Sequence, residues 1–269
     1  MSLPREGSAA GEELLRGNGG CRKTERKKNM RIIFIRHGDP DYEHDSLTEK
    51  GWREAALLAE RVSAWRVTDF YVSPLGRARD TASLSLQKTG RTARTLPWLR
   101  EFYAPIHDPA RGEDVIPWDF YPSFWTKEEG LYDRNGFADT PVMRTGSVKE
   151  EFLRVSAGLD SLLADYGYVR EGGVYRTDRR EKVQREAQIV LFCHMGVTLY
   201  LCGHLLGISP VVLTAGFFLP PASVTVLASE EREAGCAYFR CQTAGDTSHL
   251  RLGGEPVSHM GYFTEPFQG

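Results

Sequence analysis

Short apolar runs recur along the chain from residue 31 onward. Residues 31–35 (RIIFI) and 189–193 (IVLFC) are almost continuously apolar and rich in β-branched side chains, which is typical of strands buried on both faces. Residues 70–72 and 92–96 are shorter runs, which we interpret as further strands. The pattern therefore predicts a sheet that is covered on both faces.

Helical patterns follow three of these runs. Residues 48–65 carry apolar side chains at helical spacing and begin with Thr48, a residue type suited to capping a helix. Residues 76–87 and the apolar stretch 197–206, which ends at Gly207, predict two more helices. Strands that alternate with helices predict an α/β fold with helices on both faces of the sheet. Ligands in such folds bind beyond the carboxyl ends of the strands.

Other segments depart from this alternation. Residues 103–146 are rich in Pro, aromatic and acidic side chains without clean periodicity, which predicts an inserted cap or lid over the site. Residues 168–176 predict a β-hairpin that turns at Gly172-Gly173. Residues 223–227 and 237–242 predict a pair of closing strands.

Length and composition favour one globular domain. A chain of 269 residues with 41% hydrophobic content can bury a sizeable core, and we place the domain at residues 30–269. Residues 1–29 are rich in Gly, Ser and charged side chains and are expected to form a disordered, solvated tail. The formal net charge of -2 gives no global reason to expect a nucleic acid or an acidic membrane as partner. Any anion recognition should therefore be local.

The cysteines and the hydropathy pattern bear on the compartment. The five cysteines are odd in number and form no C-x-x-C pair, which argues against a disulfide framework and a structural zinc site. No apolar run approaches the roughly 18 residues of a transmembrane helix, and the first residues lack the apolar stretch of a signal peptide. We therefore expect a cytoplasmic protein without a membrane partner.

Chemistry-bearing side chains follow three predicted strands. Arg36-His37-Gly38 ends the first strand, the stretch 73–82 (SPLGRARDTA) follows the second, and His194 follows residues 189–193. A neutral imidazole can attack phosphorus, and a guanidinium fork matches phosphate. Helix N-termini also favour anions. If the strand ends meet at one edge of the sheet, these groups predict a site for phosphate-ester chemistry.

These motifs resemble those of a known family. Arg-His-Gly directly after the first strand, L-T-x-x-G at 47–51 and S-x-L-x-R-A-x-x-T-A at 73–82 are together similar to the histidine phosphatase superfamily, also called phosphoglycerate-mutase-like, in its first, mostly bacterial branch. The resemblance covers residues 30–100 closely and 187–228 more loosely. It implies a three-layer α/β/α sandwich with a mostly parallel central sheet.

The resemblance also implies roles for individual residues. It makes His37 the phosphorylated nucleophile and places Arg36, Arg77 and His194 around the phosphate, with no metal or other cofactor. Glu101 falls where the family has its general acid, although an exposed glutamate without that role is the alternative. His194 would also belong to the catalytic set.

The sequence departs from the family pattern in places. Asp39 follows Gly38 where Glu or Gln is common, and Met195 follows His194 where Gly is usual. The Asn-rich loop of the mutase members is missing after Arg-His-Gly, which favours phosphatase over mutase.

Other polar and aromatic side chains receive structural interpretations. We expect Arg79 to face solvent or an ion pair, and we interpret His44, His107 and Asp108 as loop residues rather than metal ligands. Residues 246–249 (DTSH) favour a structural turn. The insertion's aromatics either stack on a substrate or pack its own core; they are Trp118, Tyr121, Phe124, Trp125 and Tyr132.

The leading hypothesis is a phosphatase that hydrolyses small phosphomonoesters by ping-pong transfer through a phosphohistidine. A phosphoglycerate mutase-type phosphotransferase is the first alternative. A non-catalytic phosphate-binding or scaffold protein of the same fold is the second. The sequence leaves the physiological substrate and the oligomeric state open.

Overall fold

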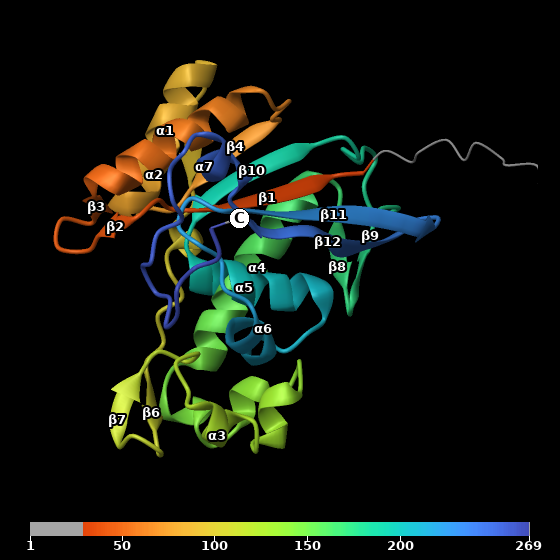
Figure 1. Cartoon of the computed structure of the whole chain (residues 1–269). Coiled ribbons are helices and arrows are strands. Elements are labelled where there is room, and N and C mark those ends of the chain that lie inside the picture. Colours follow the sequence, from red (N-terminus) through yellow and green to blue (C-terminus); the bar gives the residue numbers. More distant parts are fainter. Residues whose placement is uncertain (1–28, 269) are drawn as a thin grey trace, which may run out of the picture.

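Residues 29–268 are the part of the chain that the computed structural model describes (Figure 1). An eight-stranded sheet in the order β5-β4-β10-β1-β11-β12-β9-β8 runs through its centre. Its parallel half contains the buried strands that the sequence predicts: β5 (Ala93–Thr95), β4 (Asp69–Val72), β10 (Gln188–Cys193) and β1 (Arg31–Arg36). The predicted tail at residues 1–29 lies, except for Asn29, outside the described part.

The other half of the sheet is antiparallel. It consists of β11 (Val224–Glu233), β12 (Cys236–Asp246), β9 (Val174–Arg176) and β8 (Val169–Glu171). The predicted hairpin at 168–176 and the predicted closing pair are confirmed, and both closing strands are longer than expected. Parallel pairing is thus confined to the half of the sheet that carries the sequence motifs.

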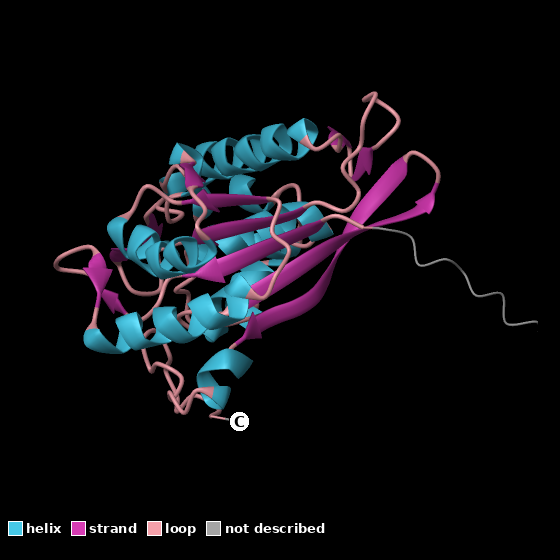
Figure 2. Cartoon of the chain, turned by 90° about the horizontal axis from the view of Figure 1, so that it is seen from above, coloured by secondary structure: helices cyan, strands magenta, loops and turns pink. Residues whose placement is uncertain are grey.

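Helices cover both faces of the sheet (Figures 1 and 2), so the three-layer α/β/α prediction is confirmed. The upper face in Figure 1 carries α1 (Glu49–Ser63) and α2 (Gly76–Thr89). The lower face carries α4 (Val148–Asp165) and α5 (Met195–Leu206). The Thr48 side chain accepts a hydrogen bond from the Gly51 amide, as expected of the N-cap of α1. Among residues 29–268, no helix is long and apolar enough to span a membrane.

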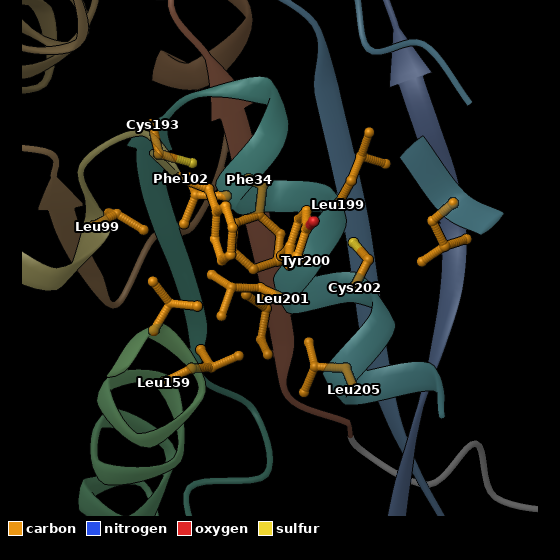
Figure 3. Packing of buried hydrophobic residues seen from close by; sticks show 14 of the residues in the cluster. Phe34, Leu99, Phe102, Leu159, Cys193, Leu199, Tyr200, Leu201, Cys202 and Leu205 are labelled. Carbon is orange, nitrogen blue, oxygen red and sulfur yellow. The ribbon is translucent and has the colours of Figure 1, made fainter. Parts of the chain in front are cut away.

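The alternation of side chains along β1 divides the core in two. Ile33 and Ile35 pack in the cluster under α1 and α2, whereas Ile32 and Phe34 belong to the larger cluster on the opposite face. Figure 3 shows this larger cluster, in which the Phe102 and Tyr200 rings stack with centroids 3.7 Å apart. A sheet packed on both faces holds the ends of its strands rigidly, and the site lies at such ends.

Residues 103–146 form short elements below the main layers in Figure 1. These are the hairpin β6 (Ile106–Asp108) and β7 (Glu113–Val115), the short helix α3 (Pro122–Trp125), and 3₁₀ turns. Leu131, Phe137 and Met143 join the larger core cluster. The segment is therefore packed onto the domain through its own apolar side chains, while its role as a lid stays a prediction.

The remaining elements are short. The hairpin β2 (Pro40–Asp41) and β3 (Ser46–Leu47) follows the Arg-His-Gly motif. The helix α6 (Pro210–Gly216) follows α5, and α7 (Ser248–Leu252) packs on α1.

Candidate active site

The order of the strands brings the predicted residues to one edge of the sheet. β10 lies between β4 and β1, so the residues that follow these three strands are Ser73, His194 and His37 in spatial order. Backbone bonds fix this edge: the His37 amide donates to the Cys193 carbonyl at 3.0 Å, and the Ser73 amide donates to the Phe192 carbonyl at 2.9 Å. The expected convergence of the motifs is thus found.

His37 is buried and its orientation is set by the main chain. Its Nδ1 lies 2.8 Å from the Gly38 carbonyl oxygen, and because a carbonyl only accepts, Nδ1 must carry the proton. The other ring nitrogen, Nε2, is then left with its lone pair. Burial, together with the charges of Arg36 and Arg77, holds the pKa of His37 well below its usual range. The ring is therefore a neutral imidazole with a bare Nε2 at neutral pH.

His194 lies beside it, with the two ring centroids 5.2 Å apart. Its Nε2 is 2.7 Å from the Ser73 hydroxyl oxygen, which itself accepts a hydrogen bond from the Leu75 amide. The Ser73 hydroxyl can then donate a hydrogen bond to Nε2. In that arrangement the ring proton of His194 is on Nδ1, an atom that is buried without a partner. Burial, followed by the positive neighbours, also keeps the pKa of this histidine well below its usual range.

The two predicted arginines act on both histidines, because each lowers the pKa of His37 and of His194. Arg36 donates from Nη1 to the Leu219 carbonyl at 2.5 Å. Arg77 donates from Nη1 to Asp45 at 2.6 Å, and the other oxygen of Asp45 accepts from the Gly76 amide at 2.6 Å. The Nε atoms of both arginines are buried without partners.

Glu101 closes the site from the side of α5. Its carboxylate accepts hydrogen bonds from the amides of Val197 at 2.8 Å and Gly196 at 3.3 Å, so it sits at the N-terminus of that helix. Burial raises the pKa of Glu101, while these backbone bonds oppose the rise. A side chain on Gly196 would meet Trp118 at 2.3 Å and Glu101 at 2.9 Å, so only glycine fits there. The alternative of an exposed, unengaged glutamate does not hold.

Sequence reasoning missed several contributors to the site. Thr81 accepts the Gly38 amide at 3.0 Å, and the buried Glu54 accepts the Asp39 amide at 2.7 Å. Both lie in helices next to recognised motifs, so a helical wheel of α1 and α2 would have shown them on the buried face. Ser258 donates a hydrogen bond to Asp39 from more than 200 residues away in sequence. No local pattern marks that contact.

The other predicted assignments fall mainly outside the site. Arg79 is exposed on α2, and His44 is an exposed loop residue paired with Asp41 at 2.8 Å. His107 is on strand β6 rather than in a loop, because its segment pairs with β7. Among residues 29–268, no group of three His, Cys, Asp or Glu side chains could hold a metal ion.

The turn and the insertion's aromatics have packing partners. Asp246 accepts the Ser248 amide at 2.8 Å and pairs with Arg61 of α1 at 2.5 Å, which favours the structural interpretation of residues 246–249. The aromatics Trp118, Phe124 and Trp125 pack against the larger core. Tyr121 and Tyr132 are exposed.

Comparisons with known proteins find a family for part of the chain. The family model described as "Histidine phosphatase superfamily (branch 1)" matches residues 32–135, a range that includes His37, Arg77 and Glu101. Over these residues the chain is similar to the histidine phosphatase superfamily. His194 lies outside the matched range and is brought to the site by the sheet.

Curated relatives match over part of their length. A probable phosphoglycerate mutase of Serratia proteamaculans is 28% identical over 143 residues, which are 50% of this chain and 63% of that protein. The corresponding Yersinia pestis protein is 29% identical over the same shares. The chain therefore spans less than two thirds of the length of these relatives.

Solved structures share the fold. A mycobacterial glucosyl-3-phosphoglycerate phosphatase superposes with a TM-score of 0.54 at 20% identity, over 81% of this chain and 99% of the other. A phosphoserine phosphatase from Entamoeba histolytica gives 0.51 at 19% identity, over 82% and 99%. At such identities the likeness concerns the fold alone.

Proposed function

We propose that this protein is a metal-independent phosphatase that hydrolyses phosphomonoesters through a phosphohistidine on His37. One observation carries the proposal: in the three residues that neighbour the buried His37, the nitrogen atoms Arg36 Nε, Arg77 Nε and His194 Nδ1 are all buried without a hydrogen-bond partner. Buried donors without partners cost free energy. A phosphoryl group would supply their acceptors.

The chemistry follows from these positions. Nε2 of His37 attacks phosphorus, and the bond from phosphorus to the ester oxygen breaks as the Glu101 carboxyl gives that oxygen its proton. The arginines and His194 stabilise the charge on the transferring oxygens. In the second step the Glu101 carboxylate takes a proton from water as that water attacks phosphorus. The nitrogen–phosphorus bond breaks, and His37 returns to its neutral form.

Hydrolysis fits the charges better than transfer to a sugar acid does. Arg36 and Arg77 are the two arginines whose charges lower the pKa of both histidines. The two negative charges of a phosphomonoester would be balanced by these two arginines. A phosphoglycerate also brings a carboxylate, which would need a further cation.

Trapping the phosphoenzyme tests the proposal. We expect a panel of phosphomonoesters to be hydrolysed in the presence of EDTA, with acid-labile phosphate bound to the wild type. His37→Ala should lower kcat/KM by roughly 10⁴-fold or more and bind no phosphate covalently. Transfer of the trapped phosphate to 3-phosphoglycerate instead of water would favour the mutase. Binding without turnover would favour a non-catalytic protein, and activity that EDTA removes and a metal restores would exclude the metal-free mechanism.

A further inference from the structure

Tyr42 is an exposed aromatic side chain beside Arg77. It stands in the turn between β2 and β3 and is 59% exposed. Its ring centre is 5.4 Å from the guanidinium carbon of Arg77. Burial lowers the pKa of Arg36, and Tyr42 is the first group that opposes this effect. Tyr42 therefore lies over Arg77, is near enough to act on the charge of Arg36, and keeps much of its surface open.

Two further rings lie near Arg36. The Arg36 guanidinium carbon lies 5.3 Å from the centre of the Phe218 ring, and the Tyr262 ring lies 4.0 Å from that of Phe218. Tyr262 is close enough to Arg36 for that charge to lower its pKa against the larger, raising effect of burial. Arg36 is thus bordered by aromatic rings from two distant parts of the chain.

The segment that carries Tyr262 is held in place by polar contacts. Glu255 binds Lys50 at 2.7 Å and Arg53 at 2.8 Å, and Ser258 donates to Asp39, two residues after His37. These contacts tie residues 255–262 to α1 and to the nucleophile's own loop. These contacts hold in place the segment that carries Tyr262. We call Tyr42, Phe218 and Tyr262 the rim of the site.

The rim favours one kind of leaving group. The phosphoryl group would bind Arg36 and Arg77. The Asp45 carboxylate accepts a hydrogen bond from Arg77, and Asp39 lies two residues after His37. A leaving group with a further negative charge would meet these carboxylates, while Arg36 and Arg77 would already be engaged by the phosphoryl group. A planar ring would instead find aromatic faces and the edges of two guanidinium groups, which attract π systems.

We propose that the substrate is a phosphomonoester whose leaving alcohol carries a planar aromatic ring, bound against Tyr42 beside Arg77 and against Phe218 and Tyr262 beside Arg36. The proposal rests on the proposed phosphatase function and specifies its substrate class. It makes Tyr42 a specificity-determining residue.

Two esters of matched shape test the proposal. Benzyl phosphate and cyclohexylmethyl phosphate release primary alcohols of similar acidity and size, so they differ mainly in aromaticity. We expect the wild type to prefer benzyl phosphate by about three- to tenfold in kcat/KM. Tyr42→Leu, which keeps apolar bulk, should reduce the ratio to about one, and Tyr42→Phe should retain it. Tyr132→Leu, at an exposed tyrosine of the insertion that contacts Trp125, is the matched control and should leave the ratio unchanged.

Because the readout is a ratio of two substrates, a general loss of activity in Tyr42→Leu does not affect it. Equal kcat/KM values for the two esters in the wild type, or an unchanged preference in Tyr42→Leu, would overturn the aromatic substrate class and leave the phosphatase standing. The absence of hydrolysis and of phosphoenzyme with every ester tested would instead overturn the phosphatase, and this proposal with it.

Discussion

The two ends of the parallel strands differ in the burial and the hydrogen-bond partners of their polar side chains. At the carboxyl ends, His37 and His194 are almost completely buried, and three N–H donors lack acceptors. At the amino ends lies an open cavity of about 960 Å³, lined by charged side chains such as Arg66 and Glu231. There Glu231 pairs with Arg185 at 2.8 Å. The candidate site is therefore marked by buried histidines and unsatisfied buried atoms that occur together, and not by the volume of an open cavity.

The largest expected difference between the two ends concerns the arginines. Arg77→Ala should lower kcat/KM by about 10²- to 10³-fold, because it removes a donor to the charge that develops on phosphorus. Arg66→Ala, at the opposite end, is the matched control and should change kcat/KM less than twofold. Steady-state kinetics with one ester would measure both. Equal effects of the two substitutions would remove Arg77 from the site.

A second contrast concerns the buried carboxyl groups. Burial raises the pKa of Glu54 to about 7, whereas the hydrogen bond from Arg185 lowers the pKa of Glu231. Ionised Glu54 is disfavoured in the folded state, so its contribution to stability is present at low pH and is lost as the pH rises from about 4.5 to about 7. Glu54→Gln should remove that loss, which amounts to up to about 3 kcal/mol above pH 7.

Urea unfolding from pH 4 to 8 would measure this effect. Glu231→Gln should act in the opposite sense, because a lowered pKa stabilises the folded state above the unfolded pKa of the group. A wild-type stability that does not fall between pH 4.5 and 7 relative to Glu54→Gln would show that Glu54 is solvated.

The smallest contrast concerns two buried serines. Ser73→Ala removes the partner of His194 Nε2, and we expect kcat/KM to fall by about tenfold, together with a loss of about 1 kcal/mol of stability. Ser229, near the amino ends, accepts the Met30 amide at 3.0 Å and contacts the Tyr168 hydroxyl at 3.1 Å. Ser229→Ala should cost about 1 kcal/mol of stability and leave kcat/KM unchanged. A reversal of this pattern would show that Ser73 only stabilises the fold.

Local patterns in the sequence predicted the motif-bearing half of the fold well. The strands β1, β4, β5 and β10 and the helices α1, α2 and α5 lie within a few residues of their predicted bounds, because a period of two or of 3.6 residues is visible over a single element. The long helix α4 was not predicted. It spans residues 148–165, and buried side chains such as Leu159 and Leu163 lie at helical spacing along it.

The sequence predicted which side chains form the candidate site, but not the hydrogen bonds that orient them. Spacing relative to strand ends indicated His37, Arg77 and His194, because the carboxyl ends of parallel strands share one edge. The tautomer of His37 depends on the Gly38 carbonyl, and the binding of Glu101 depends on the N-terminus of α5. Such contacts depend on side-chain direction and on packing, which spacing does not encode.

The sequence by itself thus determined the layered fold and indicated His37, Arg36 and Arg77 as candidates for a phosphate site, since each follows from a short pattern and from residue types suited to phosphate chemistry. Only the tertiary structure decided which groups are left without partners and which rings border them. Tyr42, Phe218 and Tyr262 come together around the arginines although they lie in distant parts of the chain. The physical reason is that the order of the strands and long-range polar contacts place these segments, and neither is visible within a window of sequence.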